Sequence, residues 1–122
     1  MHYHCLVYFD PREVFDGSPG SVALLDEVRP HVERLTRSGH LVMFQPLNLP
    51  QEAITVQMRD GKVSTADGPF METKEMLGGL MLIEARDLNE AIQVAAKWPG
   101  ARYGQIEVRP VEEALRPEGR YN

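Results

Sequence analysis

The order of strand-like and helical segments is the feature that most constrains the fold of this chain. Two segments of helical periodicity, residues 19–38 and 88–97, each lie between segments rich in β-branched and aromatic residues. A hairpin is predicted between the second strand and the next. Because each helix follows a strand and returns to a strand, the simplest packing is a ferredoxin-like α+β sandwich. In that fold, both helices cover one face of an antiparallel sheet.

Local signals mark the ends of these segments. Ser18-Pro19 is a helix start with a serine cap, and Asp87 with Glu90 forms a capping box. Asp60-Gly61 predicts a two-residue hairpin turn, and residues 10–20 are expected to form a loop. The apolar stripes expected to face the sheet are Val22, Leu25, Val28, Val32 and Leu35 in the first helix and Leu88, Ile92, Ala95 and Ala96 in the second.

Length and composition limit the class of protein. A chain of 122 residues fits a single domain, expected over residues 1–111, followed by a polar tail over residues 112–122. Eighteen acidic against thirteen basic residues give a net charge of −5, which argues against nucleic-acid binding. No apolar run is long enough for a membrane span and no secretion signal is visible, so a cytoplasmic protein is expected. The single cysteine, Cys5, is expected to be a buried, inert thiol, with a nucleophile as the alternative.

The sheet face away from the helices predicts an assembly. That face would combine apolar groups with the polar side of the hairpin and with Glu107 and Arg109 of the last strand. A half-apolar open sheet is usually covered by a second copy. We therefore expect a homodimer whose sheets stack face to face and enclose a pocket, with a monomer whose open face is wet as the alternative.

Residues 67–79 contain more charge than a turn requires. Asp67 and Glu72 are acid–base candidates, because a carboxylate beside another carboxylate or in a dry cleft exchanges a proton near neutral pH. Lys74 and Glu75 are candidate ligand-binding residues, with Lys74 either holding an anionic group or keeping the carboxylates ionised. In the structural alternative, Asp67 fastens the turn, Glu72 caps backbone amides and Lys74 is solvated.

Three further positions have both a functional and a structural interpretation. Phe70 is a candidate for stacking on a ligand, with a core anchor as the favoured alternative. Glu107 and Arg109 share a strand face and are candidates either for ligand binding or for an ion pair across a dimer. The Gly78-Gly79 pair indicates a bulge or a close backbone approach, or else tight packing between subunits.

The histidines do not predict a metal site. His2 and His4 share a strand face, but no cysteine or carboxylate stands beside them at a recognisable ligand spacing. The sequence also lacks a glycine-rich phosphate loop and a serine or cysteine nucleophile motif. We therefore expect chemistry without a cofactor and without a metal.

Several motifs resemble the DGPF signature of the YCII-related family. They are Asp67-Gly-Pro-Phe70, Glu72-Thr-Lys-Glu75, Leu77-Gly-Gly79, Asp87-Leu-Asn-Glu-Ala91, Arg102-Tyr-Gly104 and Glu107-Val-Arg-Pro110. The resemblance covers residues 50–111 well and the first strand and helix more loosely. It implies a ferredoxin-like fold that pairs into a dimeric α/β barrel.

The resemblance implies less about activity. Some relatives resemble muconolactone-processing enzymes in fold, and a catalytic His–Asp pair has been proposed in the broader family. Neither His31 nor His40 is followed by an aspartate that matches this pair. DGPF proteins are also associated with extracytoplasmic-function sigma factors. The sequence therefore leaves three hypotheses: a small-molecule enzyme or binder using isomerase, lyase or hydrolytic-type proton transfer, a non-catalytic regulatory partner of such a sigma factor, and a purely structural dimer.

Overall fold

The computed structural model of the protein describes residues 1–115. Its strands form a four-stranded antiparallel sheet in the order β2-β5-β1-β6 and a separate two-stranded sheet, β3-β4. The elements in chain order are β1 (His2–Phe9), α1 (Pro11–Val14), α2 (Pro19–Arg37), β2 (Leu41–Pro46), the 3-10 turn η1 (Pro50–Glu52), β3 (Ile54–Arg59), β4 (Lys62–Asp67), β5 (Met76–Glu84), α3 (Leu88–Ala96), the 3-10 turn η2 (Pro99–Arg102) and β6 (Gly104–Pro110).

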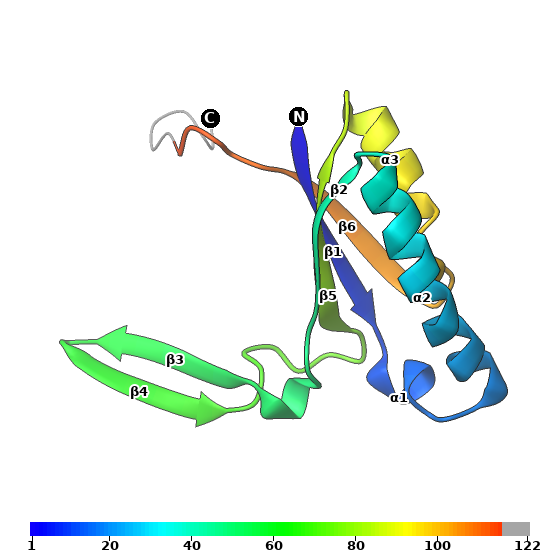
Figure 1. Ribbon diagram of the computed structural model, residues 1–122. Helices are drawn as coiled ribbons and strands as arrows, with labels where there is room; N and C mark the ends of the chain where they lie inside the picture. The colour runs from blue at the N-terminus through cyan, green and yellow to red at the C-terminus, as the bar shows by residue number, and fades with distance from the viewer. Residues whose placement is uncertain (116–122) are drawn as a thin grey trace.

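The two long helices, α2 and α3, lie on the same side of the four-stranded sheet (Figure 1). The core fills the space between these layers, and alternate residues of β1 and β5 point into it. The largest side chains that are fully buried there are Tyr3, Cys5, Met81 and Ile83. The predicted α+β class, with helices on one face of an antiparallel sheet, is confirmed.

The predicted caps are also confirmed. The Ser18 hydroxyl oxygen accepts a hydrogen bond from the Ser21 amide at 3.2 Å, and Pro19 occupies the first turn of α2. The Asp87 carboxylate accepts from the Glu90 amide at 2.9 Å at the start of α3. In turn, the Glu90 carboxylate accepts from the Arg86 amide at 3.0 Å. These contacts are local, which is why the sequence located both helix starts.

The predicted helix stripes were partly wrong. In α2, Val22 and Leu25 are exposed, and the buried residues are Ser21, Leu24, His31 and Leu35. In α3, Leu88 and Ile92 are exposed, whereas Ala91, Val94 and Ala95 are buried. Both helices carry apolar residues on more than one face. A prediction from residue size and periodicity alone therefore included exposed residues beside the buried face and missed some of the buried ones.

The hairpin forms as predicted but does not join the main sheet. Asp60 and Gly61 have φ angles of 51° and 73°, as a tight hairpin turn requires, and Arg59 pairs with Lys62 across it. The hairpin extends away from the four-stranded sheet (Figure 1). The expectation that its polar side would lie on the open sheet face was therefore wrong. Periodicity identifies the faces of a strand but not its neighbour.

The open face of the main sheet is part apolar and part charged. Half-buried Leu6, Leu80 and Leu82 lie on it beside exposed residues of β6. Leu6 pairs with Glu107, and His4 pairs with Arg109. Among the described residues, no group hydrogen-bonds to the shielded Nδ1 atom of His4. This face therefore has the mixed character that the sequence indicated, without the hairpin.

The described part of the chain contains no helix that is long and apolar enough to span a lipid bilayer. Residues 112–115 of the predicted polar tail follow β6 without helix or strand, and residues 116–122 lie outside the described residues. The division into residues 1–111 and 112–122 stays a prediction.

Candidate functional site

Residues 67–75, here called the DGPF bend, begin at the end of strand β4. The backbone of the first residues holds this bend in place. Asp67 is the last residue of β4, and Gly68 follows with a φ of 94°, a conformation that glycine adopts without strain. The Gly68 amide donates to the Ala53 carbonyl at 2.7 Å, and the Thr55 hydroxyl donates to the Gly68 carbonyl at 2.9 Å. The bend is thus tied to the base of the hairpin without any side chain of Asp67.

The carboxylates of Asp67 and Glu72 are exposed and free of partners within residues 1–115. Neither one fastens the turn or caps a backbone amide there, as the structural alternative required. The Lys74 ammonium likewise forms no ion pair or hydrogen bond among these residues. Two carboxylates without a partner among these residues and one lysine without a direct ion pair are therefore gathered within one bend.

An open cleft of about 950 Å³ brings these groups together with α1. Asp67, Glu72 and Lys74 line it from the bend, and Asp10 and Arg12 line it from the start of α1. The cleft thus has two cationic and three carboxylate side chains around one space. Such a set can bind an anionic or hydroxylated ligand and can exchange protons with it.

Asp10 and Arg12 are site residues that the sequence analysis missed. Asp10 is buried, and its Oδ1 accepts from the Arg12 amide at 3.0 Å, which caps α1. The Arg12 guanidinium donates to both carboxylate oxygens, at 3.2 and 3.3 Å. These hydrogen bonds, aided by the charge of Lys74, lower the pKa of Asp10. An Asp-Pro pair is a helix-start signal, but residues 10–20 were predicted to form a loop.

The fourth charged residue of the bend, Glu75, lies apart from this cleft. Its carboxylate accepts from the Gln105 side-chain amide of β6 at 3.2 Å. Glu75 and Tyr8 line a second cavity, of about 620 Å³, together with the β2–β3 connection. They also line a smaller one of about 250 Å³ with Gln105 and Glu107. Glu75 and Glu107 therefore belong to the open face of the sheet, and Asp67, Glu72 and Lys74 belong to the cleft.

The remaining candidates have different surroundings from those expected. Phe70 is 80% exposed, so its interpretation as a core anchor was wrong. Arg109 forms an ion pair with Glu107 of the same strand, and both side chains are largely exposed. The pair is therefore already formed within one chain, rather than waiting for a partner subunit.

The glycine pair of β5 makes a bulge and a close approach. The pairing of β1 with β5 shifts register between Val7 and Tyr8, opposite Gly78. A Cβ atom on Gly78 would lie 2.1 Å from the ring of Phe9. Beside this point, between the sheet and α2, is an apolar cavity of about 230 Å³. Trp98, Phe44 and Leu24 are among its lining residues, none of which is charged, so the cavity suits an apolar group.

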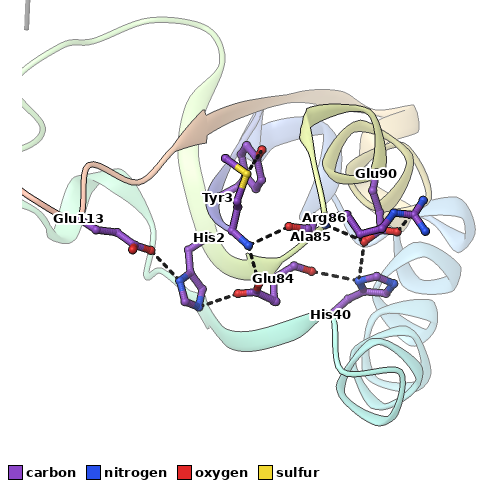
Figure 2. A network of polar contacts seen from close by, with 9 residues as sticks. His2, Tyr3, His40, Glu84, Ala85, Arg86, Glu90 and Glu113 are labelled. Carbon is purple, nitrogen blue, oxygen red and sulfur yellow. Dashed lines mark hydrogen bonds and ion pairs between the residues drawn. The ribbon is translucent and has the colours of Figure 1, made fainter.

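Cys5 and the histidines of residues 1–115 lie outside the lining of the cleft. Burial raises the pKa of the Cys5 thiol to about 11, which confirms a buried thiol with little thiolate at neutral pH. His2 lies between two carboxylates, with Nε2 2.9 Å from Glu84 and Nδ1 2.9 Å from Glu113 (Figure 2). His40 Nδ1 lies 3.0 Å from the Glu84 carbonyl oxygen and 3.9 Å from the Glu90 carboxylate (Figure 2).

This polar network is remote from the cleft. It gathers at the start of β1, whereas Asp10 of the cleft follows the end of the same strand. His31 also lies away from the cleft residues, with its ring edge-on to Trp98 at 5.5 Å between centroids. No histidine of residues 1–115 lines the cleft. The acid–base groups there are carboxylates.

Comparison with known proteins identifies the family and a similar fold. Residues 1–114 match the YCII-related domain. The chain belongs to the YCII-related family. An uncharacterized protein of Rhizobium meliloti (strain 1021) is 41% identical over 61 residues. That match covers 48% of this chain and 49% of the relative, so the chain spans about half the length of the relative it matches.

A solved structure has a similar fold. It is the 5-chloro-2-hydroxyhydroquinone dehydrochlorinase of Burkholderia phenoliruptrix AC1100, in complex with 2,5-dihydroxybenzoquinone. The TM-score is 0.54 at 14% identity, and the match covers 92% of this chain and 94% of that chain. At this identity the match establishes the α+β fold alone. The protein is thus a YCII-related protein whose fold resembles that of an enzyme converting a small molecule.

Proposed function

We propose that this protein binds or transforms a small polar molecule in the cleft between α1 and the DGPF bend. The observation that carries the proposal is the presence of two free carboxylates, Asp67 and Glu72, beside Lys74 and Arg12 in one cleft. A side chain that stabilises the fold would have a partner within the chain. Asp67 and Glu72 have none among residues 1–115, so a ligand is the natural partner for them.

The chemistry follows from the groups present. Lys74 holds an anionic or hydroxyl oxygen of the ligand, and Arg12 stays clamped on Asp10. Glu72 and Asp67 act as proton acceptor and donor on the bound molecule, as isomerases, lyases and hydrolases require. The structural neighbour, crystallised with a dihydroxybenzoquinone, supports a small hydroxylated ring as the first class of ligand to test.

We further propose that the chain is a ferredoxin-like sandwich that pairs as a dimeric α/β barrel. Leu6, Leu80 and Leu82 on the open sheet face support this proposal, because a half-apolar sheet face gains free energy when a second copy covers it. In the paired state Glu75 and Glu107 lie near the interface. The cavity beside Tyr8 is then closed on the side that is open in one chain.

The binding proposal is tested by calorimetric titration of 2,5-dihydroxybenzoquinone into the wild type and two variants. We expect Glu72→Gln and Lys74→Met to weaken binding by at least about tenfold each, corresponding to about 1.4 kcal/mol. Both residues are exposed, so the thermal midpoint is expected to stay unchanged. Glu33→Gln, on an exposed position of α2, is the matched control and should bind as the wild type does. Equal binding by Glu72→Gln, Lys74→Met and Glu33→Gln contradicts the proposal.

A second function is favoured by one observation. Phe70 and Met71, at the tip of the bend, are 80% and 63% exposed. Exposed aromatic and methionine side chains are typical of protein docking surfaces. A non-catalytic regulatory protein that docks on an extracytoplasmic-function sigma factor through this tip would lose that binding in Phe70→Ala and keep it in Glu72→Gln. The cleft proposal expects the opposite dependence for the small molecule.

A further inference from the structure

The β3–β4 hairpin, residues 54–67, is here called the arm, and one of its faces is apolar and uncovered. In the register of the arm, Met58 pairs with Val63 across the strands. The four apolar side chains of this face are Ile54, Val56, Met58 and Val63, which are 62%, 63%, 56% and 63% exposed. The opposite face is polar, with Gln57 and Ser64 paired on it. The arm is thus amphipathic, as if built to lie on another surface.

The arm needs such a surface to be stable. A two-stranded hairpin by itself is marginally stable in water. The arm forms a sheet separate from the main one and is tied to the rest of the chain at its base, through Gly68, Ala53 and Thr55. It extends away from the four-stranded sheet (Figure 1), so the core of its own chain does not cover it. An uncovered apolar face of a few hundred Å² is often an interaction site.

The charges of the arm favour a second copy of this chain as the cover. Arg59 and Lys62 pair at the tip on either side of Asp60 and Gly61, so the tip carries a net positive charge. The whole chain has a net charge of −5, and the open sheet face of each copy carries Glu75 together with the Glu107–Arg109 ion pair, so Glu75 is the unbalanced charge among these three groups. A basic tip is attracted to an acidic copy, and like-charged tips are kept apart.

The area of the arm also suits a dimer. Four side chains that are more than half exposed provide roughly 400 Å², about half of the 800 Å² or so that each partner buries in a standard interface. The open sheet face of the same chain supplies the other apolar surface. Around a two-fold axis, the two open sheet faces can therefore meet each other while the arm of each chain docks on the other copy.

We propose that the apolar face of the arm docks on a second copy of this chain, alongside the contact between the two open sheet faces. This inference rests on the proposed dimer and adds the element that clasps it. Because β4 ends at Asp67, the docked arm fixes the DGPF bend of its own chain against the partner. Asp67 pairs with Ile54 and lies on the same face of the arm, so a partner docked on this face borders the cleft.

Two neighbouring residues of β4 provide a matched test. Val63 and Ser64 are both exposed and lie on opposite faces of the arm. We expect light scattering over a dilution series to give a dimer for the wild type and for Ser64→Asp. For Val63→Asp, we expect the dimer dissociation constant to rise at least about tenfold. Hydrogen exchange should show protected arm amides in the first two proteins and fast exchange in the third, with unchanged protection of β1 and β5 in all three.

The outcomes separate the two proposals. If the wild type is a dimer and Val63→Asp dissociates no more readily than Ser64→Asp, the arm inference is overturned and the dimer stands. If the wild type is a monomer with unprotected arm amides, both the dimer and the arm inference are overturned. A monomeric wild type that floats with phosphatidylcholine vesicles through Val63 would assign the arm to a lipid surface instead, and would also overturn the inference.

Discussion

At the scale of single residues, His31 is a polar side chain that is buried at the core with one ring nitrogen lacking a hydrogen bond within residues 1–115. It lies on the buried face of α2 with 9% exposure and contacts Trp98 edge-on. Its Nε2 atom is shielded and has no hydrogen-bond partner among the described residues. Burial lowers the pKa of His31, and the positive charges of Arg34 and Lys97 lower it further, while Glu27 opposes them. The neutral ring is therefore the form that the folded state accommodates.

This environment predicts a pH-dependent stability. The pKa of His31 is below 6.5 in the folded state, so between that lowered value and 6.5 the unfolded chain binds more protons. The contribution of neutral His31 to the free energy of unfolding is complete above pH 6.5 and is lost as the pH falls through that window. Urea unfolding at about pH 7.5 and about pH 5.5 should show that the loss is smaller in His31→Phe, which keeps an aromatic ring against Trp98. An equal loss in both proteins would contradict this account.

At the scale of elements, the β1–β6 pair depends on a glycine. Phe9 pairs with Gly104, and a Cβ atom on Gly104 would lie 2.0 Å from the Tyr8 carbonyl oxygen and 3.0 Å from the Phe9 Cβ. The nearest atoms belong to the backbone or are bonded to it, so they cannot move aside without displacing a strand. Gly20, in the first turn of α2, has no atom within 4 Å of the same point.

Two alanine variants test this requirement. Gly104→Ala should lower the free energy of unfolding by about 1–3 kcal/mol or more, because a strand must move to admit the methyl group. Gly20→Ala is the control and should raise it by up to about 1 kcal/mol, since alanine favours a helix and meets no obstacle. Urea denaturation measures both. A Gly104→Ala protein as stable as Gly20→Ala would show that β6 does not approach β1 as closely as described.

The elements that the sequence predicted well are those fixed by near neighbours. Ser18 caps α2, Asp87 caps α3, and Asp60-Gly61 closes the hairpin, all through contacts within a few residues. The placement of the hairpin outside the main sheet was not predictable, because it depends on whether a strand distant in the sequence pairs with the hairpin. The same limit explains why the wrong edges of the helix stripes were chosen.

In the candidate site, too, the local arrangement could be predicted from the sequence and the contacts between distant residues could not. Asp67, Glu72 and Lys74 share one bend, so their proximity could be predicted from their spacing. Asp10 and Arg12 are more than 50 residues away from the bend in the sequence, and only the fold brings α1 close to it. Phe70 was assigned to the core because of its size, yet the bend turns it to solvent.

At the scale of the whole molecule, residues 1–115 present an open sheet face, the arm and the charged cleft close to one another. The open sheet face and the arm carry the apolar groups, and the base of the arm leads directly into the cleft. In the dimer that we propose, both surfaces are covered and the cleft lies at the subunit boundary. Assembly and ligand binding are therefore expected to strengthen each other, because each favours the docked arm.

We propose that the protein holds a small molecule in the cleft of Asp67, Glu72 and Lys74. Crystals soaked with a set of small hydroxylated aromatic and carboxylic acids, beginning with 2,5-dihydroxybenzoquinone, test it most directly. We expect bound compounds in that cleft, with an oxygen within hydrogen-bond distance of Lys74 or Glu72. Compounds that gather elsewhere and leave the cleft empty would contradict it.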